Sequence, residues 1–325
     1  MEDRVPLTAG RGWLHLGRSL REAGRLARVN PGLTGFMRHR ASQAGPKPEP
    51  DTGSWVALED ISPYLVCAVV RSEDRGFFRH RGFWWSNMWV EIKLARKEKR
   101  GVRGVSTITQ QLARNLYLHP ERSMTRKLHE AIVAQRLESA LTKRRILELY
   151  LNLIEWGDGI WGVEAAARRY FGRTPAEIDP VQAVMLASLI PAPRRPLVDR
   201  NAKRAVSTQN RLMFHLYGCG IVSSDEWGQA VDRVVYVGQS IDEGIPALEM
   251  FRRPELAIEP TLQDRPEIST GALLADDCGM DRCNRLMALV QASGRQIISR
   301  LPLWWTGDPD QVAPEGESAP AAVPA

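Results

Sequence analysis

The chain has 325 residues, of which 43% are hydrophobic and 25% charged, and this composition is typical of a globular protein rather than a disordered or fibrous one. It contains no run of about 18–20 apolar residues, which a membrane-spanning helix needs, and its N-terminus lacks the apolar core of a secretory signal. The net charge of +6 is unevenly placed, because residues 71–145 hold 18 Lys or Arg against 7 Asp or Glu and the remainder is net acidic. This basic block indicates an anionic partner (phosphates, a lipid surface or nucleic acid), or else a solvated helix face.

The apolar pattern predicts an all-α chain with little strand alternation. An Arg-rich N-terminal stretch favours an amphipathic helix, lying on a membrane or packed on the protein, with apolar Leu14, Leu20, Leu26 and Val29. Residues 44–54 carry Pro and Gly and favour a linker. Further helices are expected from Pro63 with Ser62 as the cap, over residues 83–99, 110–116, 126–141, 143–153 with Thr142 as the cap, 164–170, and from Pro180 to Pro191.

These elements divide the chain into four parts. Residues 1–50 are an N-terminal segment and linker, residues 51–200 a helical domain, and residues 201–300 an extension to which the sequence assigns no role. The tail over residues 301–325 is rich in Pro, Ala and Glu without Lys or Arg, which predicts disorder. The four cysteines show no paired CxxC spacing, so we expect them to be unpaired.

Adjacent acids follow the first well-defined helix, in the segment RSEDRGFFRHRG over residues 71–82. Glu73 and Asp74 lie there among arginines, with His80 and the aromatic Phe77 nearby. A glutamate in such surroundings can act as a general base if its pKa is brought toward the working pH. A simple ion-pair cluster at a helix end remains the alternative for this segment taken alone.

The segment GVSTITQQLARN, over residues 104–115, crowds hydroxyls and carboxamides between a glycine loop and a helix start. Its polar side chains include Ser106, Thr107, Gln110 and Gln111. Hydroxyls and free N–H groups at a helix N-terminus suit phosphates or sugar hydroxyls. Helix capping explains one hydroxyl but not the whole set.

A third segment, RSMTRKLHE, places Arg126, Lys127 and Glu130 on one helix face, at spacings of four and three residues. These residues either make a weak surface ion pair or bind phosphate through the cations, with the carboxylate orienting or protonating groups nearby.

We interpret the fourth segment, KRRILELYLN followed by GVEAAARRYFG, mainly as a structural part of the fold. Within it, Glu148 and Asn152 either support the fold or line a cleft.

With these segments in order, followed by LIPAP at residues 189–193, the chain resembles the monofunctional biosynthetic peptidoglycan transglycosylases of glycosyltransferase family 51. The matching motifs cover about residues 55–196 and include SEDRGFFRHRG, GVSTITQQLARN and RKLHE. The resemblance implies a lysozyme-like, two-lobed helical domain that polymerises lipid II into glycan strands. It also implies inversion at the anomeric carbon and release of undecaprenyl pyrophosphate.

The resemblance assigns roles to particular residues. Glu73 corresponds to the catalytic base, and Glu130 to a second glutamate that assists the leaving pyrophosphate directly or through a divalent Mg or Mn ion; no organic cofactor is implied. Arg114 replaces the usual lysine, which keeps the charge but changes its geometry. The positions expected to bind substrate are Asp74, Phe77, His80, Ser106, Thr107, Gln110, Gln111, Arg114, Asn115, Arg122, Arg126 and Lys127.

The family works at the periplasmic face of the inner membrane, with lipid II and glycan-linked undecaprenyl pyrophosphate as substrates and other cell-wall synthesis proteins as candidate partners. Residues 83–100 fall where the family has a membrane-dipping lobe, and they carry an apolar stripe, Trp85, Met88, Trp89 and Ile92, before a basic cluster. A buried core helix is the alternative. The chain shows no transmembrane anchor, and without any SxxK or KTG motif it has no penicillin-binding transpeptidase domain.

Other functions are weaker alternatives. A lysozyme-like lytic enzyme acting on finished glycan has no use for the cations around residues 110–127, because its substrate carries no pyrophosphate. A non-catalytic cell-wall scaffold is disfavoured by the presence of both Glu73 and Glu130. Nucleic-acid binding is not expected, since the chain shows no helix-turn-helix or zinc pattern.

Overall fold

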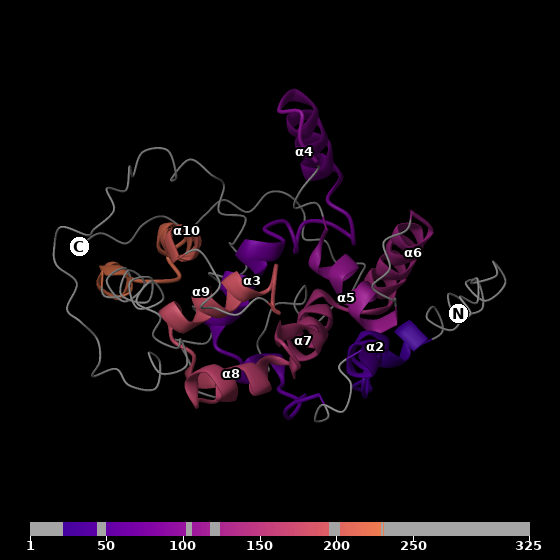
Figure 1. Cartoon of the computed structure of the whole chain (residues 1–325), viewed down its shortest axis with the longest axis horizontal. Helices are drawn as coiled ribbons and strands as arrows, with labels where there is room; N and C mark the ends of the chain where they lie inside the picture. Colours follow the sequence, from indigo (N-terminus) through magenta and orange to yellow (C-terminus); the bar gives the residue numbers. More distant parts are fainter. Residues whose placement is uncertain are drawn as a thin grey trace, which may run out of the picture.

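The computed structural model describes residues 22–43, 50–101, 106–117, 124–194, 202–228 and 230. Over these ranges the fold is almost wholly helical, as predicted (Figure 1). The helices are α2 (Gly35–Gln43), α3 (Pro63–Glu73), α4 (Trp85–Lys97), α5 (Ile108–Tyr117), α6 (Met124–Ala140), α7 (Lys143–Leu153), α8 (Val163–Phe171), α9 (Pro180–Leu189) and α10 (Ala202–Gly218). Short 3-10 turns lie at Arg25–Ala27, Leu58–Asp60 and Pro175–Glu177.

The core forms around three helices with apolar surfaces, α3, α7 and α9. Residues 65–70 of α3 are all buried, and α9 is apolar around nearly its whole circumference, as a helix enclosed by others must be. α3, α9 and α10 pack against one another, while α5 packs against α2, α6 and α7. α10 therefore joins the same body as α3 and α9, although it lies beyond the expected domain boundary at residue 200.

Helix starts follow the predicted capping chemistry, with one exception. The hydroxyl of Thr142 accepts from the backbone N–H of Arg145 at 3.0 Å and caps α7 as expected. Asp179 and Gln182 form a reciprocal capping box at the start of α9. Ser62 does not cap α3, because its hydroxyl donates instead to the carbonyl of Ile178 at 2.6 Å and ties α3 to the segment before α9.

Residues 155–161 form a structure that the sequence did not predict. Strands β1 (Glu155–Gly157) and β2 (Ile160–Trp161) pair in an antiparallel hairpin, whereas the apolar pattern predicted an all-α chain. Gly162 follows with φ +83°, and a Cβ there would lie 2.8 Å from the carbonyl oxygen of Asn152. Only glycine fits this return from the hairpin into α8.

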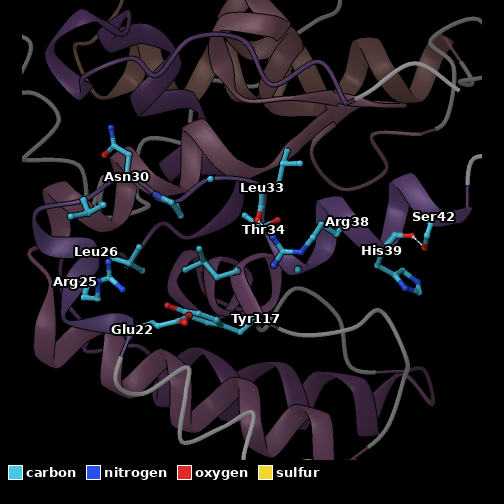
Figure 2. Close-up of a pocket in the computed structure, with 15 residues that line it drawn as sticks. Glu22, Arg25, Leu26, Asn30, Leu33, Thr34, Arg38, His39, Ser42 and Tyr117 are labelled. Carbon is cyan, nitrogen blue, oxygen red and sulfur yellow. Dashed lines mark hydrogen bonds between the residues drawn. The ribbon is translucent and has the colours of Figure 1, made fainter. Parts of the chain in front are cut away.

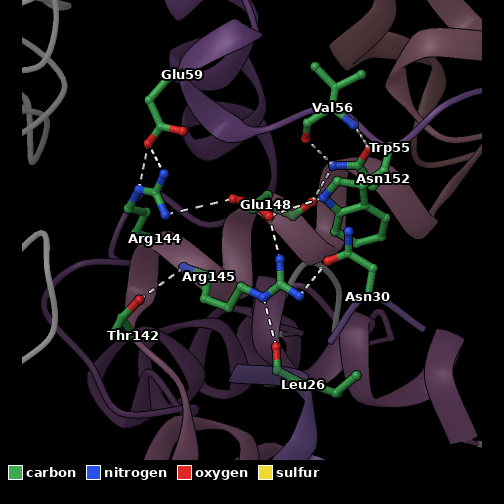
Figure 3. A network of polar contacts seen from close by, with 10 residues as sticks. All are labelled: Leu26, Asn30, Trp55, Val56, Glu59, Thr142, Arg144, Arg145, Glu148 and Asn152. Carbon is green, nitrogen blue, oxygen red and sulfur yellow. Dashed lines mark hydrogen bonds and ion pairs between the residues drawn. The ribbon is translucent and has the colours of Figure 1, made fainter. Parts of the chain in front are cut away.

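A polar network anchors the N-terminal segment on α7 (Figure 3). The guanidinium of Arg145 donates to the carbonyl of Leu26 at 2.7 Å and to the side chain of Asn30 at 2.6 Å, and it also pairs with Glu148. Asn152 exchanges hydrogen bonds with the backbone of Val56, at 2.9 and 2.8 Å. Glu148 and Asn152 are both buried in this network, which supports the architectural interpretation over the cleft-lining one.

α4 projects away from the remaining described helices (Figure 1). Trp85 and Trp89 are 59% and 57% exposed, and Val90 and Leu94 are exposed beside them. Among the α4 side chains whose burial the structure describes, Ala95 is the buried one. The alternative of a buried core helix is therefore wrong for the described structure. Within the described ranges, no helix combines the length and apolarity needed to cross a bilayer.

Several sequence predictions fall wholly or partly outside the described residues. These include Leu14, Leu20, Arg122, most of the linker, and everything beyond residue 230. At the N-terminus the structure shows a short helical stretch and a 3-10 turn at Arg25–Ala27, in which Leu26 is buried while Val29 is exposed. Cys67 is buried and is not part of a disulfide, but Cys219 is disulfide-bonded, so the expectation of unpaired cysteines was wrong for Cys219.

Candidate active site

Glu73 ends α3 and receives a hydrogen bond from the middle of α5. The side-chain amide of Gln111 donates to Glu73 Oε2 at 2.8 Å, and the hydroxyl of Tyr150, on α7, donates to Gln111 Oε1 at 2.8 Å. Because the tyrosine hydroxyl occupies the amide oxygen of Gln111, the NH₂ group is the end that faces Glu73. Three helices thus fix the orientation of one carboxylate.

Burial raises the pKa of Glu73 above its ordinary value, while the hydrogen bond from Gln111 and the charge of Arg114 oppose that rise. The side chain is nevertheless partly exposed and lines a cavity. A carboxylate with a raised pKa and access to solvent space has the properties of a general base. Burial also raises the pKa of Tyr150 well above 10, so its hydroxyl remains protonated and donates.

Asp74, directly after Glu73, faces inward. Its two oxygens lie 2.9 and 3.0 Å from His80 Nε2, and Oδ2 also accepts from the backbone N–H of Ile108 at 3.0 Å. Asp74 and His80 are 5% and 8% exposed, so they connect the end of α3 to the start of α5. Phe77 is fully buried in the same region and contacts the His80 ring edge-on.

The start of α5 is closed by a capping box. Thr107 Oγ1 accepts from the backbone N–H of Gln110 at 3.2 Å, and Gln110 Oε1 accepts from the backbone N–H of Thr107 at 3.0 Å. Thr107 also donates to the carbonyl of Gly82 at 2.7 Å, and both residues of the box are buried. The capping alternative therefore accounts for Thr107 and Gln110, and Gln111 is left as the carboxamide directed at Glu73.

Glu130 is held by two cations on its own helix, α6. Arg126 donates to Glu130 Oε2 at 2.9 Å, and the Lys127 ammonium contacts the other carboxylate oxygen. Lys127 also donates to Ser106 Oγ at 3.2 Å, which links this cluster to the segment before α5. Glu130 is 2% exposed, whereas the Lys127 side chain is 42% exposed, so the cluster presents positive charge to solvent over a buried carboxylate.

This arrangement does not fit a metal held by the protein at Glu130. Both of its oxygens contact cations, and among the described residues no group of three or more His, Cys, Asp or Glu side chains converges. Divalent cations prefer several oxygen ligands of this kind. We therefore derive no step through a metal ion.

The remaining predicted residues lie on α5. Asn115 is buried and donates to the backbone carbonyl of Gln111 at 3.0 Å, which is a role within the helix. Arg114 is partly exposed and lies within electrostatic reach of Glu73. The binding roles of these residues remain predictions.

Tyr150 is the residue near this site that the sequence interpretation missed. It lies within the apolar pattern LELYLN, where it reads as one more core position. A buried tyrosine hydroxyl usually has a hydrogen-bond partner, so a tyrosine within a core pattern already indicated a polar group nearby.

A second cavity, of about 670 Å³, lies apart from these residues, between residues 22–42 and the C-terminal end of α5 (Figure 2). Arg25, Arg38 and Tyr117 line it, and burial together with the nearby Glu22 carboxylate raises the pKa of Tyr117. None of the predicted catalytic or binding residues lines this cavity.

Comparison with known proteins shows that the chain is similar to transglycosylases. A family model described as "Transglycosylase" matches residues 41–216. The "Biosynthetic peptidoglycan transglycosylase" of Azoarcus sp. (strain BH72) is 46% identical over 169 residues, covering 51% of this chain and 73% of that protein. The protein of the same name from Dechloromonas aromatica (strain RCB) is 45% identical over 175 residues, covering 53% of this chain and 75% of its relative.

Proposed function

Because the chain belongs to the transglycosylase family and is a peptidoglycan glycosyltransferase, we propose that it polymerises lipid II with Glu73 as the base. The observation that carries this proposal is the hydrogen-bonded series from Tyr150 through Gln111 to Glu73. This series orients the Glu73 carboxylate at the end of the core helix α3, and burial raises the pKa of that carboxylate. A base of this kind accepts a proton near neutral pH.

In the proposed reaction, Glu73 takes the proton of the acceptor sugar's 4-hydroxyl. The oxygen attacks the donor's anomeric carbon from the face opposite the lipid pyrophosphate, so a new C–O bond forms with inversion as the old one breaks. The undecaprenyl pyrophosphate departs with the bonding electron pair. In this proposal Arg126 and Lys127 offset its charge, since stabilising charge that develops in the transition state is usually the largest catalytic contribution.

Glu130 has a supporting role in this proposal. Its carboxylate holds Arg126 and Lys127 on one face of α6, and through Lys127 it reaches Ser106. A residue that fixes two cations contributes by positioning them rather than by transferring a proton. The Asp74–His80 pair acts likewise, by fixing α5 and therefore Gln111 relative to Glu73.

We also propose that α4 places the enzyme at the periplasmic face of the inner membrane. Trp85 and Trp89 are exposed on this projecting helix, and Lys93, Arg96 and Lys97 follow them. Exposed tryptophans beside basic residues suit the interface of an anionic bilayer.

The assay supplies purified full-length protein with labelled lipid II and, separately, with preformed glycan. The proposal predicts long glycan chains from lipid II and no shortening of the preformed material. Shortening of glycan without polymerisation would instead indicate the lytic alternative.

A further inference from the structure

The cavity of about 670 Å³ between residues 22–42 and the end of α5 plays no part in the proposed reaction. Two arginines line it, Arg25 from the 3-10 turn at Arg25–Ala27 and Arg38 from α2 (Figure 2). Glu73 and the other residues assigned to catalysis do not line it. The cavity is therefore separate from the catalytic centre, and its own side chains decide what it can bind.

Both arginines keep their charge in the cavity wall. Among the residues that the structure describes, no acid forms an ion pair with Arg25 or Arg38. Arg38 Nη1 donates to the backbone carbonyl of Leu33, and a guanidinium has further N–H groups to offer. Arginine presents these donors as a planar fork that matches phosphate and carboxylate oxygens. The wall therefore favours an anionic oxygen group.

Tyr117 adds a neutral donor at the end of α5. Burial, together with the charge of the Glu22 carboxylate, raises the pKa of its hydroxyl, so the hydroxyl stays protonated at neutral pH and can donate. Within the described ranges, no other group hydrogen-bonds to this hydroxyl. Glu22 is the one acid among the described lining residues, so the two arginines leave the wall net positive.

Apolar side chains lie beside these cations. Val29 and Leu33 line the same cavity and are 51% and 46% exposed. A small inorganic anion makes no use of such side chains, whereas a phospholipid carries its phosphate next to its acyl chains. Basic residues beside exposed apolar ones thus suit the headgroup of an anionic lipid.

We propose that this cavity binds a phosphate ester, with the headgroup of an anionic phospholipid as its source, and that Arg25, Arg38 and Tyr117 donate to the phosphate oxygens. The site is independent of Glu73 and of α4. Arg145 bonds the same N-terminal segment to α7, so a lipid held here is coupled to the helical core.

The test compares full-length wild type with two double variants that lose the same charge. Arg25→Gln/Arg38→Gln removes both cations of the cavity. Arg28→Gln/Arg169→Gln is the control, because both of its arginines are exposed and neither lines the cavity. Cosedimentation with phosphatidylglycerol vesicles should be about tenfold weaker for the cavity variant than for the control, the effect of one lost charge-assisted contact. Since α4 is unchanged in all three proteins, its contribution to vesicle binding cancels.

Glycerol phosphate, a soluble form of the headgroup, identifies the source of the phosphate. If a lipid is the ligand, the cavity variant binds vesicles more weakly than the control does. If a free phosphate ester is the ligand, the two variants bind vesicles equally, and only the cavity variant loses the rise in melting temperature that glycerol phosphate gives the wild type. Both results support a phosphate site, whereas a cavity variant that matches the control in both measurements would overturn it.

A single substitution keeps the test valid if the double variant folds poorly, since Arg38 also bonds to its own segment. Arg25→Gln and Arg28→Gln each remove one exposed arginine from the same few residues, and Arg25 alone of the two lines the cavity. Arg25→Gln should weaken the same binding about threefold relative to Arg28→Gln, with equal melting temperatures in the absence of ligand. Equal binding by these two variants would also overturn the proposal.

Discussion

Replacement of Tyr150 by Phe tests how the orientation of Glu73 is fixed. The Tyr150 hydroxyl is fully buried and donates to Gln111 Oε1, and the amide of Gln111 in turn donates to Glu73. Without the hydroxyl, the Gln111 amide is free to rotate and its bond to the carboxylate weakens. Since that bond lowers the pKa of Glu73 against the effect of burial, the variant should have a higher Glu73 pKa.

The size of the effect follows from the strength of the affected bond. A hydrogen bond to a charged group contributes about 1.5–3 kcal/mol, and loss of roughly half of it changes an equilibrium by about three- to tenfold. A base with a higher pKa is protonated over more of the acidic range. Turnover should therefore fall about three- to tenfold on the acid side and approach the wild-type value at higher pH.

The assay is the pH profile of kcat for lipid II polymerisation. The acid limb of Tyr150→Phe should shift to higher pH, while Tyr170→Phe, which loses a partly buried donor to the carbonyl of Trp156 at 3.1 Å, should keep the wild-type profile. A Tyr150→Phe profile that is lowered equally at all pH values would refute the reasoning, because it would indicate a purely structural role.

Other substitutions probe the remaining parts of the account. Glu73→Gln should raise the melting temperature at pH 7 by about 2–4 °C, since a carboxyl with a raised folded-state pKa destabilises the fold once it ionises. In calorimetry, the difference in melting temperature between the variant and the wild type should disappear as the pH falls below the ordinary Glu range. A variant less stable than the wild type at pH 7 would contradict the burial argument. Lys127→Met should cut kcat/KM for lipid II about tenfold or more but cost under about 1 kcal/mol of stability, because its ion pair is partly exposed. Arg168→Met, which breaks exposed pairs on α8, is the control and should leave kcat/KM unchanged; equal kinetics for the two variants would remove Lys127 from the leaving-group role. Trp89→Ser should weaken binding to anionic phospholipid vesicles about tenfold in a sedimentation assay without lowering the melting temperature, and unchanged binding would remove α4 from the membrane interface.

Local patterns in the sequence predicted most of the helical fold. Thr142 caps α7 as the sequence indicates, and the helix from Pro63 ends at Glu73, within the predicted catalytic segment of residues 71–82. Both features depend on neighbours within a few residues, which a sequence displays directly. The hairpin at residues 155–161 was missed because its strands are too short to show alternation.

Contacts between distant segments explain what the sequence could not show. Tyr150 looks like a core residue until α5 brings Gln111 to its hydroxyl, 39 positions away in the chain. Asp74 and Glu73 look equivalent in the sequence because they are adjacent acids. In the folded chain Asp74 faces inward to His80, whereas Glu73 lines a cavity. The sequence did not indicate the contact of His215 with Arg71, because α10 lies beyond the matched motifs and meets Arg71 only in the folded chain.

The central claim is that Glu73 is the base in glycan polymerisation, and the rate of lipid II consumption by Glu73→Gln tests it most directly. Glutamine keeps the shape and can still accept a hydrogen bond from Gln111, but it cannot take a proton at neutral pH. The account predicts a loss of at least about 10²–10⁴-fold, the usual contribution of a general base, with a melting temperature no lower than that of the wild type and retained binding of lipid II. A Glu73→Gln protein that still converts lipid II to glycan at the wild-type rate would contradict it.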